Sequence, residues 1–199
     1  TTIWYNDAAI QEGKCETMFM LGDHISVNGN ESGDIIKEDG TIGAVVTFSV
    51  QEVSAPYHAV TAQHVSSYSD GAYIIKVNGT SNFQDYRLVK NDKSAVSFDS
   101  AADILAAYSD DETSLKFKHM CTFLAITVNS ESSSVKDNIK SVYIRQAGEQ
   151  PNIAGKWNLT YDGEGNAPVL TPNELTEVIA YDCTDEGVAQ DKAMIIGIP

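Results

Sequence analysis

Histidine is the residue type in this chain best suited to acid–base or metal chemistry, and it occurs four times, as His24, His58, His64 and His119. His58 and His64 stand six positions apart, a spacing that would place both on one face of an extended strand. A metal ion would need a third ligand nearby, and the sequence contains no H-E-x-x-H or equivalent motif. We therefore expect surface or packed histidines and no metal site.

The three cysteines, Cys15, Cys121 and Cys183, are the other candidates for chemistry. Their spacing matches no zinc site, and no C-x-x-C redox pair is present. An odd and sparse set of cysteines does not support a disulfide framework either. A cysteine in an apolar run is usually a core residue, so we expect none of the three to carry a reaction.

His119 and Cys121 form the arrangement closest to a nucleophile pair, because residues two apart share one side of a strand. A catalytic thiol needs an exposed and electropositive setting. The neighbours here are Phe117 and Phe123, which provide an apolar setting instead. We therefore predict that His119 and Cys121 are core residues.

Other sequence features carry little sign of catalysis. The chain has no G-x-S-x-G elbow, no phosphate-binding G-x-x-x-x-G-K-[ST] loop and no G-x-G-x-x-G fingerprint. Acidic pairs such as Asp110 and Asp111 are expected in so acidic a chain. The turns 28–39 and 162–166 could bind calcium weakly. The first lacks EF-hand spacing and its terminal Glu, and we interpret both turns as solvated loops. We expect no enzyme activity, no cofactor, and no catalytic, cofactor-binding or metal-binding residue.

Composition narrows the possible partners. The chain has 199 residues, is 42% hydrophobic and carries a formal net charge of −15. This charge opposes binding to nucleic acid and to anionic membrane surfaces. No stretch approaches the roughly 20 apolar residues of a membrane helix. The sequence starts at Thr1 rather than Met, from which we expect that an N-terminal segment is removed, as in an exported protein.

Short extended runs separated by turn residues predict an all-β fold. Strong turn pairs, whose residues tolerate positive φ, are Asn28-Gly29, Asp39-Gly40, Asn78-Gly79 and Asp162-Gly163. Between them lie runs rich in β-branched and aromatic residues, at 42–50, 73–77, 115–128, 142–145, 157–161 and 194–198. This pattern indicates a β-sandwich or barrel, and we predict a sandwich of about seven or more antiparallel strands with little helix.

Two of these runs carry more specific predictions. Trp157, Leu159 and Tyr161 alternate with polar residues, which is typical of a half-buried strand. The run 115–128 starts with alternation and becomes apolar on both faces after Met120, which predicts the central strand of the core.

Two other segments could be helical. Residues 171–174 have the form of a capping box with proline at the first helical position, which predicts a short helix from Pro172 to about Ala180. The segment 103–108, Asp-Ile-Leu-Ala-Ala-Tyr, fits either a helical turn or a strand.

Three stretches, in order, resemble the fimbrillin-like family of Bacteroidales bacteria. The first is 18–27, where Phe19, Gly22, Asp23, Ile25 and Val27 are similar to the family's "F…G-D-x-I-x-V" segment. The second, 57–62, is similar to its "Y-x-A-x-Y-P" region but lacks the final Tyr-Pro. The third comprises 103–108 and 115–128, which resemble "D-L-M-x-A … L-x-F-x-H-x-x-x-x-L-x-I-x-V". The segment that follows, 139–144, fits the family's next strand. The resemblance covers roughly residues 18–198 and makes 103–108 extended rather than helical.

This resemblance implies an exported surface lipoprotein of the outer membrane, built from transthyretin-like or immunoglobulin-like β-sandwiches, that forms fimbriae or sits at their tips. It implies that an edge groove in one subunit accepts a strand from the next, and that the membrane is reached through a lipid anchor on the precursor. The chain lacks the family's lipid-attachment cysteine at its start and is short for two sandwiches. We expect one fimbrillin-like sandwich over 1–199, or an N-terminal domain with the start of a second.

Three classes of function are therefore open for this chain. The favoured one is a structural or adhesive subunit of cell-surface fimbriae, with other fimbrial subunits as partners. The alternative is a surface glycan-binding module, because some of the nine tyrosines and two tryptophans could stack on sugars, although aromatic residues are also ordinary strand residues. The third, an enzyme, would need a pocket with convergent polar groups.

Overall fold

The computed structural model describes residues 2–4, 16–19, 22–36, 45–82, 89–90, 93–94, 103–126, 131–132, 134, 139–149, 152–182 and 194–199. Strands dominate this part of the chain, and a short 3-10 turn, η1 (Ala62–His64), joins two of them. The strands are β1 (Thr2–Trp4), β2 (Glu16–Met18), β3 (Ile25–Val27), β4 (Asn30–Glu31), β5 (Tyr57–Thr61), β6 (Val65–Ser69), β7 (Ala72–Val77), β8 (Thr80–Asn82), β9 (Val89–Lys90), β10 (Lys93–Ser94), β11 (Leu105–Ser109), β12 (Lys118–His119), β13 (Thr122–Ile126), β14 (Ser141–Ile144), β15 (Ala154–Thr160), β16 (Val169–Glu177), β17 (Ile179–Asp182) and β18 (Met194–Ile198). The all-β prediction is confirmed.

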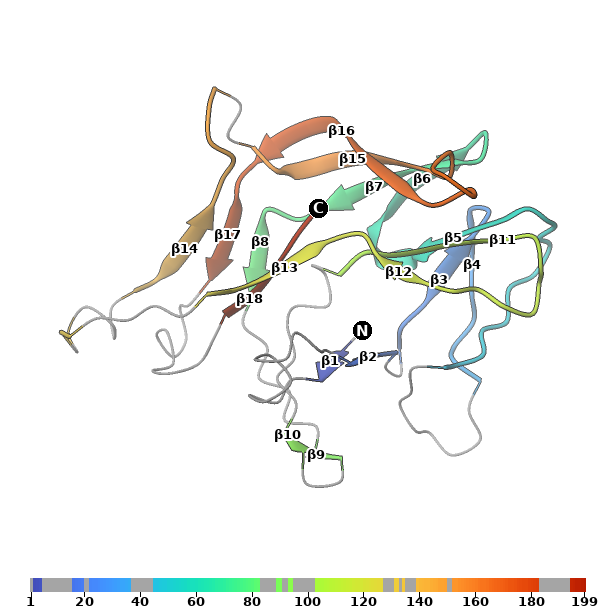
Figure 1. The fold of residues 1–199 in the computed structure, drawn as a ribbon, viewed down its shortest axis with the longest axis horizontal. Helices are drawn as coiled ribbons and strands as arrows, with labels where there is room; N and C mark the ends of the chain where they lie inside the picture. The colour runs from blue at the N-terminus through green and yellow to red at the C-terminus, as the bar shows by residue number, and fades with distance from the viewer. Residues whose placement is uncertain are drawn as a thin grey trace.

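Two antiparallel sheets form the body of the fold (Figure 1). One has five strands in the order β12-β11-β5-β3-β4, and the other has four in the order β16-β15-β7-β6. Beside them lie a three-stranded sheet, β14-β17-β8, whose β17–β8 pair is parallel, and the antiparallel ribbon β13-β18. The described residues also include the small pairs β1–β2 and β9–β10.

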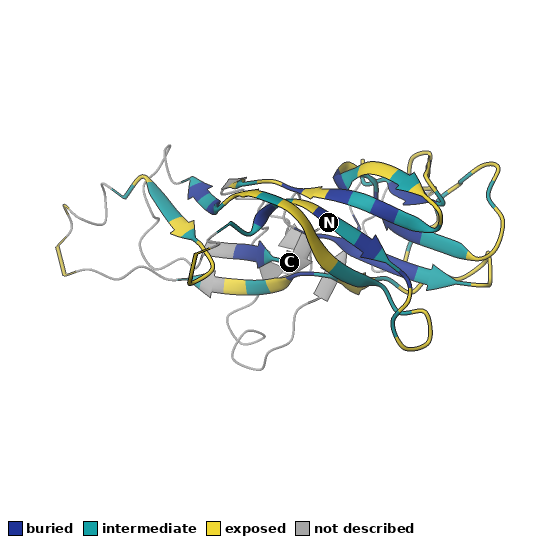
Figure 2. Cartoon of the chain, turned by 90° about the horizontal axis from the view of Figure 1, so that it is seen from above, coloured by how far each residue is buried: buried dark blue, intermediate teal, exposed yellow. Residues whose placement is uncertain are grey.

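The main core lies between the five-stranded and the four-stranded sheets. Val60 and Ala106 come from the first sheet, and Tyr73, Ile75 and Leu159 from the second, and all are buried in one cluster. In Figure 2 the buried residues follow the strands while the turns are exposed. Alternation in β15 agrees with the sequence prediction, because Trp157, Leu159 and Tyr161 are buried and Lys156 is exposed.

A second core covers the opposite face of the five-stranded sheet. It contains Ile25 and Val27 from β3, Ala59 from β5, and Leu105 and Ala107 from β11. Among the described residues, the cover on this face is made of the irregular segments 45–53 and 112–117 rather than of another sheet. This difference between the two faces leaves space over the second core, as described below.

Two turns show why the hairpins close where they do. Asn28 and Gly29 have φ values of 48° and 84°, and Val27 pairs with Asn30 across them, as the turn pair predicts. Asp70 and Gly71, with φ values of 52° and 80°, make the equivalent turn between β6 and β7. The predicted turn at Asp39-Gly40 lies outside the described residues.

Several predicted elements take a different form. The run 115–128 is not one central strand: β12 is a two-residue edge strand, β13 pairs with β18 alone among the described strands, and Phe123 is only half-buried. The predicted helix at 172–180 is wrong, because these residues continue β16 and enter β17. Within 42–50, residues 45–50 form only an isolated bridge from Thr47 to Ile36. The extended interpretation of 103–108 is confirmed by β11.

Candidate functional site

The four histidines lie in separate surroundings. His24 contacts the Ser32 carbonyl oxygen through Nδ1 at 3.0 Å and lies 3.5 Å from Asp34 through Nε2. His64 is buried, with Nε2 3.0 Å from the carbonyl oxygen of Asp103 and Nδ1 3.2 Å from that of Lys76. His64 thus ties β7 to the segment that precedes β11. The described residues contain no group of three His, Cys, Asp or Glu side chains that could hold a metal ion.

The buried carboxylate of Asp103 pairs with the partly exposed imidazole of His119. The Asp103 side chain is fully buried, and its Oδ1 lies 2.8 Å from His119 Nδ1. The second oxygen, Oδ2, has no hydrogen-bond partner among the described residues. About a third of the His119 side chain is exposed, so the prediction that His119 is a core residue is wrong: its ring lies at the surface and reaches inward to the carboxylate.

Cys121, by contrast, is buried as predicted. Burial raises the pKa of its thiol to about 12, so the thiol stays protonated at neutral pH. A protonated buried thiol is a poor nucleophile, and Cys121 therefore does not complete a catalytic group with His119. Cys15 and Cys183 lie outside the described residues.

An aromatic cluster surrounds His58 at one end of the sandwich. The His58 ring stacks on Tyr161 with centroids 4.6 Å apart, and Tyr108 and Tyr68 lie 5.6 and 6.4 Å away. Nδ1 of His58 contacts the Tyr68 hydroxyl at 3.1 Å, and the Tyr161 hydroxyl donates to the carbonyl oxygen of Ala59 at 2.7 Å. The cluster connects β5 and β11 of one sheet with β6 and the end of β15 in the other.

Burial lowers the pKa of His58 below its ordinary value of 6.5. The unfolded chain then takes up the proton more readily, so the contribution of His58 to stability is complete above pH 6.5 and is lost as the pH falls below it. We expect the drop in melting temperature between pH 7 and pH 5.5 to be smaller in His58→Gln than in the unmodified protein. Thermal denaturation at both pH values measures this, and an equal drop in both proteins would contradict the assignment.

Carboxylates in the acidic turns accept hydrogen bonds from residues close by in the sequence. Asp110 accepts a bond from the Tyr108 hydroxyl at 2.8 Å, and Asp111 accepts from the backbone and hydroxyl of Thr113, which lowers the pKa of the Asp111 carboxyl. In the turn 162–166, Asp162 accepts from the Thr160 hydroxyl at 2.6 Å. Asp162 and residues 164–166 are exposed, which agrees with the interpretation of 162–166 as a solvated loop. Within 28–39, residues 37–39 lie outside the described residues.

Two open edges belong to the ribbon of β13 and β18. Its five register pairs run from Thr122 opposite Ile198 to Ile126 opposite Met194. Ile196 is fully buried in the main core, so the ribbon is anchored to the sandwich. Neither outer edge pairs with another strand in the described part of the chain. Leu124 on β13 is 38% exposed, which is high for so large an apolar side chain in a strand.

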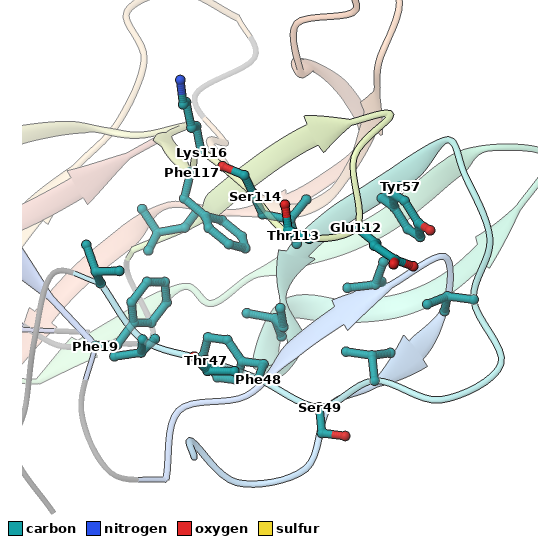
Figure 3. Close-up of a pocket in the computed structure, with 18 of the residues that line it drawn as sticks. Phe19, Thr47, Phe48, Ser49, Tyr57, Glu112, Thr113, Ser114, Lys116 and Phe117 are labelled. Carbon is teal, nitrogen blue, oxygen red and sulfur yellow. The ribbon is translucent and has the colours of Figure 1, made fainter. Parts of the chain in front are cut away.

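A pocket of about 960 Å³, lined by both apolar and polar side chains, lies over the second core. Its floor includes Ile25, Val27 and Leu105, and its walls are the segments 45–53 and 112–117 (Figure 3). Phe19 lies edge-on to two other rings, Phe48 at 5.4 Å and Phe117 at 5.6 Å between centroids. This pocket was missed in the sequence, although Val46, Phe48 and Val50 alternate as residues covering one apolar face would.

No helix in the described part of the chain has the length and apolar character needed to span a bilayer. Comparisons with protein-family models, with curated proteins and with solved structures return no match to this chain.

Proposed function

We propose that this protein is a structural or adhesive subunit of cell-surface fimbriae, and that it joins neighbouring subunits through a strand added to the ribbon of β13 and β18. The observation that carries the proposal is the uncharged edge of this ribbon, which has no partner strand in the part of the chain that the structure describes. Unpaired backbone groups along a strand edge are a template for a strand from another chain. The role is one of assembly and adhesion, without a catalytic step.

The edges of the two main sheets carry features that oppose strand addition. The long edge strand β16 contains Pro172, which has no N–H to donate, and the exposed residues Glu174 and Glu177. In the five-stranded sheet the edge strands β4 and β12 have only two residues each. The β6 edge is irregular between Val65 and Ser67. These are the usual means by which β proteins avoid unwanted pairing.

The β13–β18 ribbon has none of these features. Its strands, Thr-Phe-Leu-Ala-Ile and Met-Ile-Ile-Gly-Ile, contain no charged residue and no proline. Exposed Leu124 adds apolar surface beside the edge. An incoming strand would therefore gain backbone hydrogen bonds and apolar contacts together.

The resemblance described above supports the same class of function. It implies a location at the cell surface, in a fimbrium of the outer membrane, with other fimbrial subunits as partners and a lipid anchor on the precursor. Under this proposal the ribbon of β13 and β18 is the part of the subunit that receives a neighbour's strand.

A surface glycan-binding module is the second candidate, favoured by the aromatic cluster at His58. The rings of His58, Tyr68 and Tyr108 are only partly buried, and the Tyr108 hydroxyl is held by Asp110. Partly exposed aromatic rings can stack on sugar rings, and a neighbouring carboxylate can accept hydrogen bonds from sugar hydroxyls. The two candidates use different residues and strands, so an adhesive subunit could contain both.

The Leu124→Lys variant tests the assembly proposal. An incoming strand would have to desolvate the new ammonium, so we expect association to weaken by about tenfold or more. Sedimentation of the purified protein over a range of concentrations measures this. Ile36→Lys is the matched control, because Ile36 is also an exposed apolar residue, at 57%, but lies beside the five-stranded sheet.

The unmodified protein and Ile36→Lys should associate alike as concentration rises, while Leu124→Lys stays monomeric with an unchanged circular dichroism spectrum. Equal association of all three proteins, or an unmodified protein that stays monomeric up to its solubility limit, would contradict the proposal.

A further inference from the structure

We propose that the pocket over the second core binds an uncharged amphiphile, a single alkyl or acyl chain with a neutral hydroxylated head. This site is separate from the β13–β18 ribbon, so the inference goes beyond the proposed function and does not depend on it.

The size and lining of the pocket suit an apolar chain. Its volume of about 960 Å³ falls within the usual range for small-molecule sites. Ile25, Val27 and Leu105 make an apolar floor, and Phe19, Phe48 and Phe117 form an aromatic wall around it (Figure 3). The floor side chains are already almost fully buried, so they offer a bound chain contact rather than exposed area. The apolar surface that the chain would remove from water belongs mainly to the partly exposed Phe48 and Phe117.

The apolar surface also continues outward from the pocket. Val45 belongs to the lining, yet it is 88% exposed. Single exposed apolar residues are ordinary, but Val45 continues an apolar lining at the mouth of a cavity. An elongated ligand would cover Val45 while its far end fills the pocket.

The charges around the pocket argue against an anionic head. Lys116 is exposed, and in Figure 3 its ammonium group points away from the pocket. Glu52 and Glu112 are part of the lining, and the whole chain carries a net charge of −15. A ligand carboxylate or phosphate would be repelled by these groups. The exposed Thr47, Thr113 and other hydroxyl residues of the lining instead suit a neutral head that exchanges hydrogen bonds.

The floor of the pocket also argues against a peptide strand as the occupant. β3 is paired with β4 and β5, and β11 is paired with β5 and β12. Strand addition needs a row of unpaired backbone groups, whereas this floor presents side chains from the face of a sheet. An alkyl chain needs no backbone partner and fits such a face.

A chain-length series tests the proposal directly. The probes are octanoyl-, decanoyl- and dodecanoylglycerol, each below its micelle concentration, with dodecanoate as the charged counterpart, and binding is measured by calorimetry at pH 7. We expect affinity to rise roughly threefold to fourfold with each added methylene, and dodecanoate to bind about tenfold or more weaker than dodecanoylglycerol. Absent binding, affinity independent of chain length, or equal binding of dodecanoate would overturn the proposal.

Substitutions then locate the site. Val50→Trp should fill the pocket and weaken dodecanoylglycerol binding by about tenfold or more. If this variant does not fold, Thr113→Trp at the exposed rim replaces it, with Thr176→Trp on exposed β16 as the matched control. Binding that survives the pocket variants would place the ligand elsewhere and refute the assignment. If Leu124→Lys binds dodecanoylglycerol as the unmodified protein does, the pocket and the assembly edge are separate sites. Loss of dodecanoylglycerol binding in Leu124→Lys would refute that separation.

Discussion

Leu159→Ala is expected to lower the free energy of unfolding by about 2–5 kcal/mol. Leu159 lies in β15, between β7 and β16, and its side chain is fully buried between the two main sheets. Truncation removes buried methyl groups and leaves a cavity that packed strands on both sides prevent from closing. A domain of this size has only about 5–15 kcal/mol of stability in total, so the loss should be plain in a denaturant midpoint.

Leu124→Ala is the matched control, because it makes the same change at a partly exposed site on β13. We expect it to cost less than half as much as Leu159→Ala. Equal shifts of the two denaturant midpoints would mean that the space between the sheets is not the core.

Tyr73→Phe should cost about 1–3 kcal/mol, although it removes a single oxygen atom. The Tyr73 hydroxyl lies 3.1 Å from the carbonyl oxygen of Ser26 and 3.0 Å from that of His58, and it accepts a bond from the Gly29 amide at 3.0 Å. Phenylalanine would leave these backbone groups without that partner, at a buried position for the Ser26 carbonyl and at partly buried positions for the other two. The hydroxyl thus fixes the β3–β4 hairpin and β5 to β7 of the opposite sheet.

Thermal and denaturant unfolding of Tyr73→Phe measure this contribution, with Tyr143→Phe as the control on a side chain that is 66% exposed. If the two variants unfold alike, the buried hydroxyl does not join the two sheets in the manner described.

The sequence predicts the parts of the fold that depend on local chemistry. Asn28-Gly29 closes a hairpin because both residues accept positive φ, and Trp157 and Leu159 alternate with polar residues because one face of β15 is buried. These properties belong to a few neighbouring residues, so no knowledge of the rest of the chain is needed.

The errors arise where tertiary contacts decide. Pro172 and Glu174 form a good helix start, but pairing with β15 draws them into the edge strand β16. The apolar run 115–128 suggests one central strand, but the chain leaves the five-stranded sheet after His119 and pairs with β18 from the far end of the sequence. Only the fold reveals which distant segment supplies such a partner.

The candidate sites also combine features set by neighbouring residues with features set by contacts between distant parts of the chain. The burial of Cys121 could be predicted from its apolar neighbours. The pairing of His119 with Asp103 joins residues sixteen positions apart, one in β12 and the other just before β11. The pocket combines the early Phe19, the segment 45–53 and the segment 112–117. No spacing in the sequence connects these three regions, which meet only because β3, β5 and β11 form one sheet.

The central claim, that subunits join at the β13–β18 ribbon, is tested most directly by hydrogen exchange of backbone amides in dilute and in assembled protein. We expect the outward-facing amides of 122–126 or of 194–198, according to the edge at which the strand is added, to exchange more slowly by about tenfold or more after assembly, because each gains a backbone partner. Amides along β16 and β6 should be unchanged. Assembled protein in which the ribbon exchanges as it does in the monomer, or in which β16 or β6 is protected instead, would contradict the account.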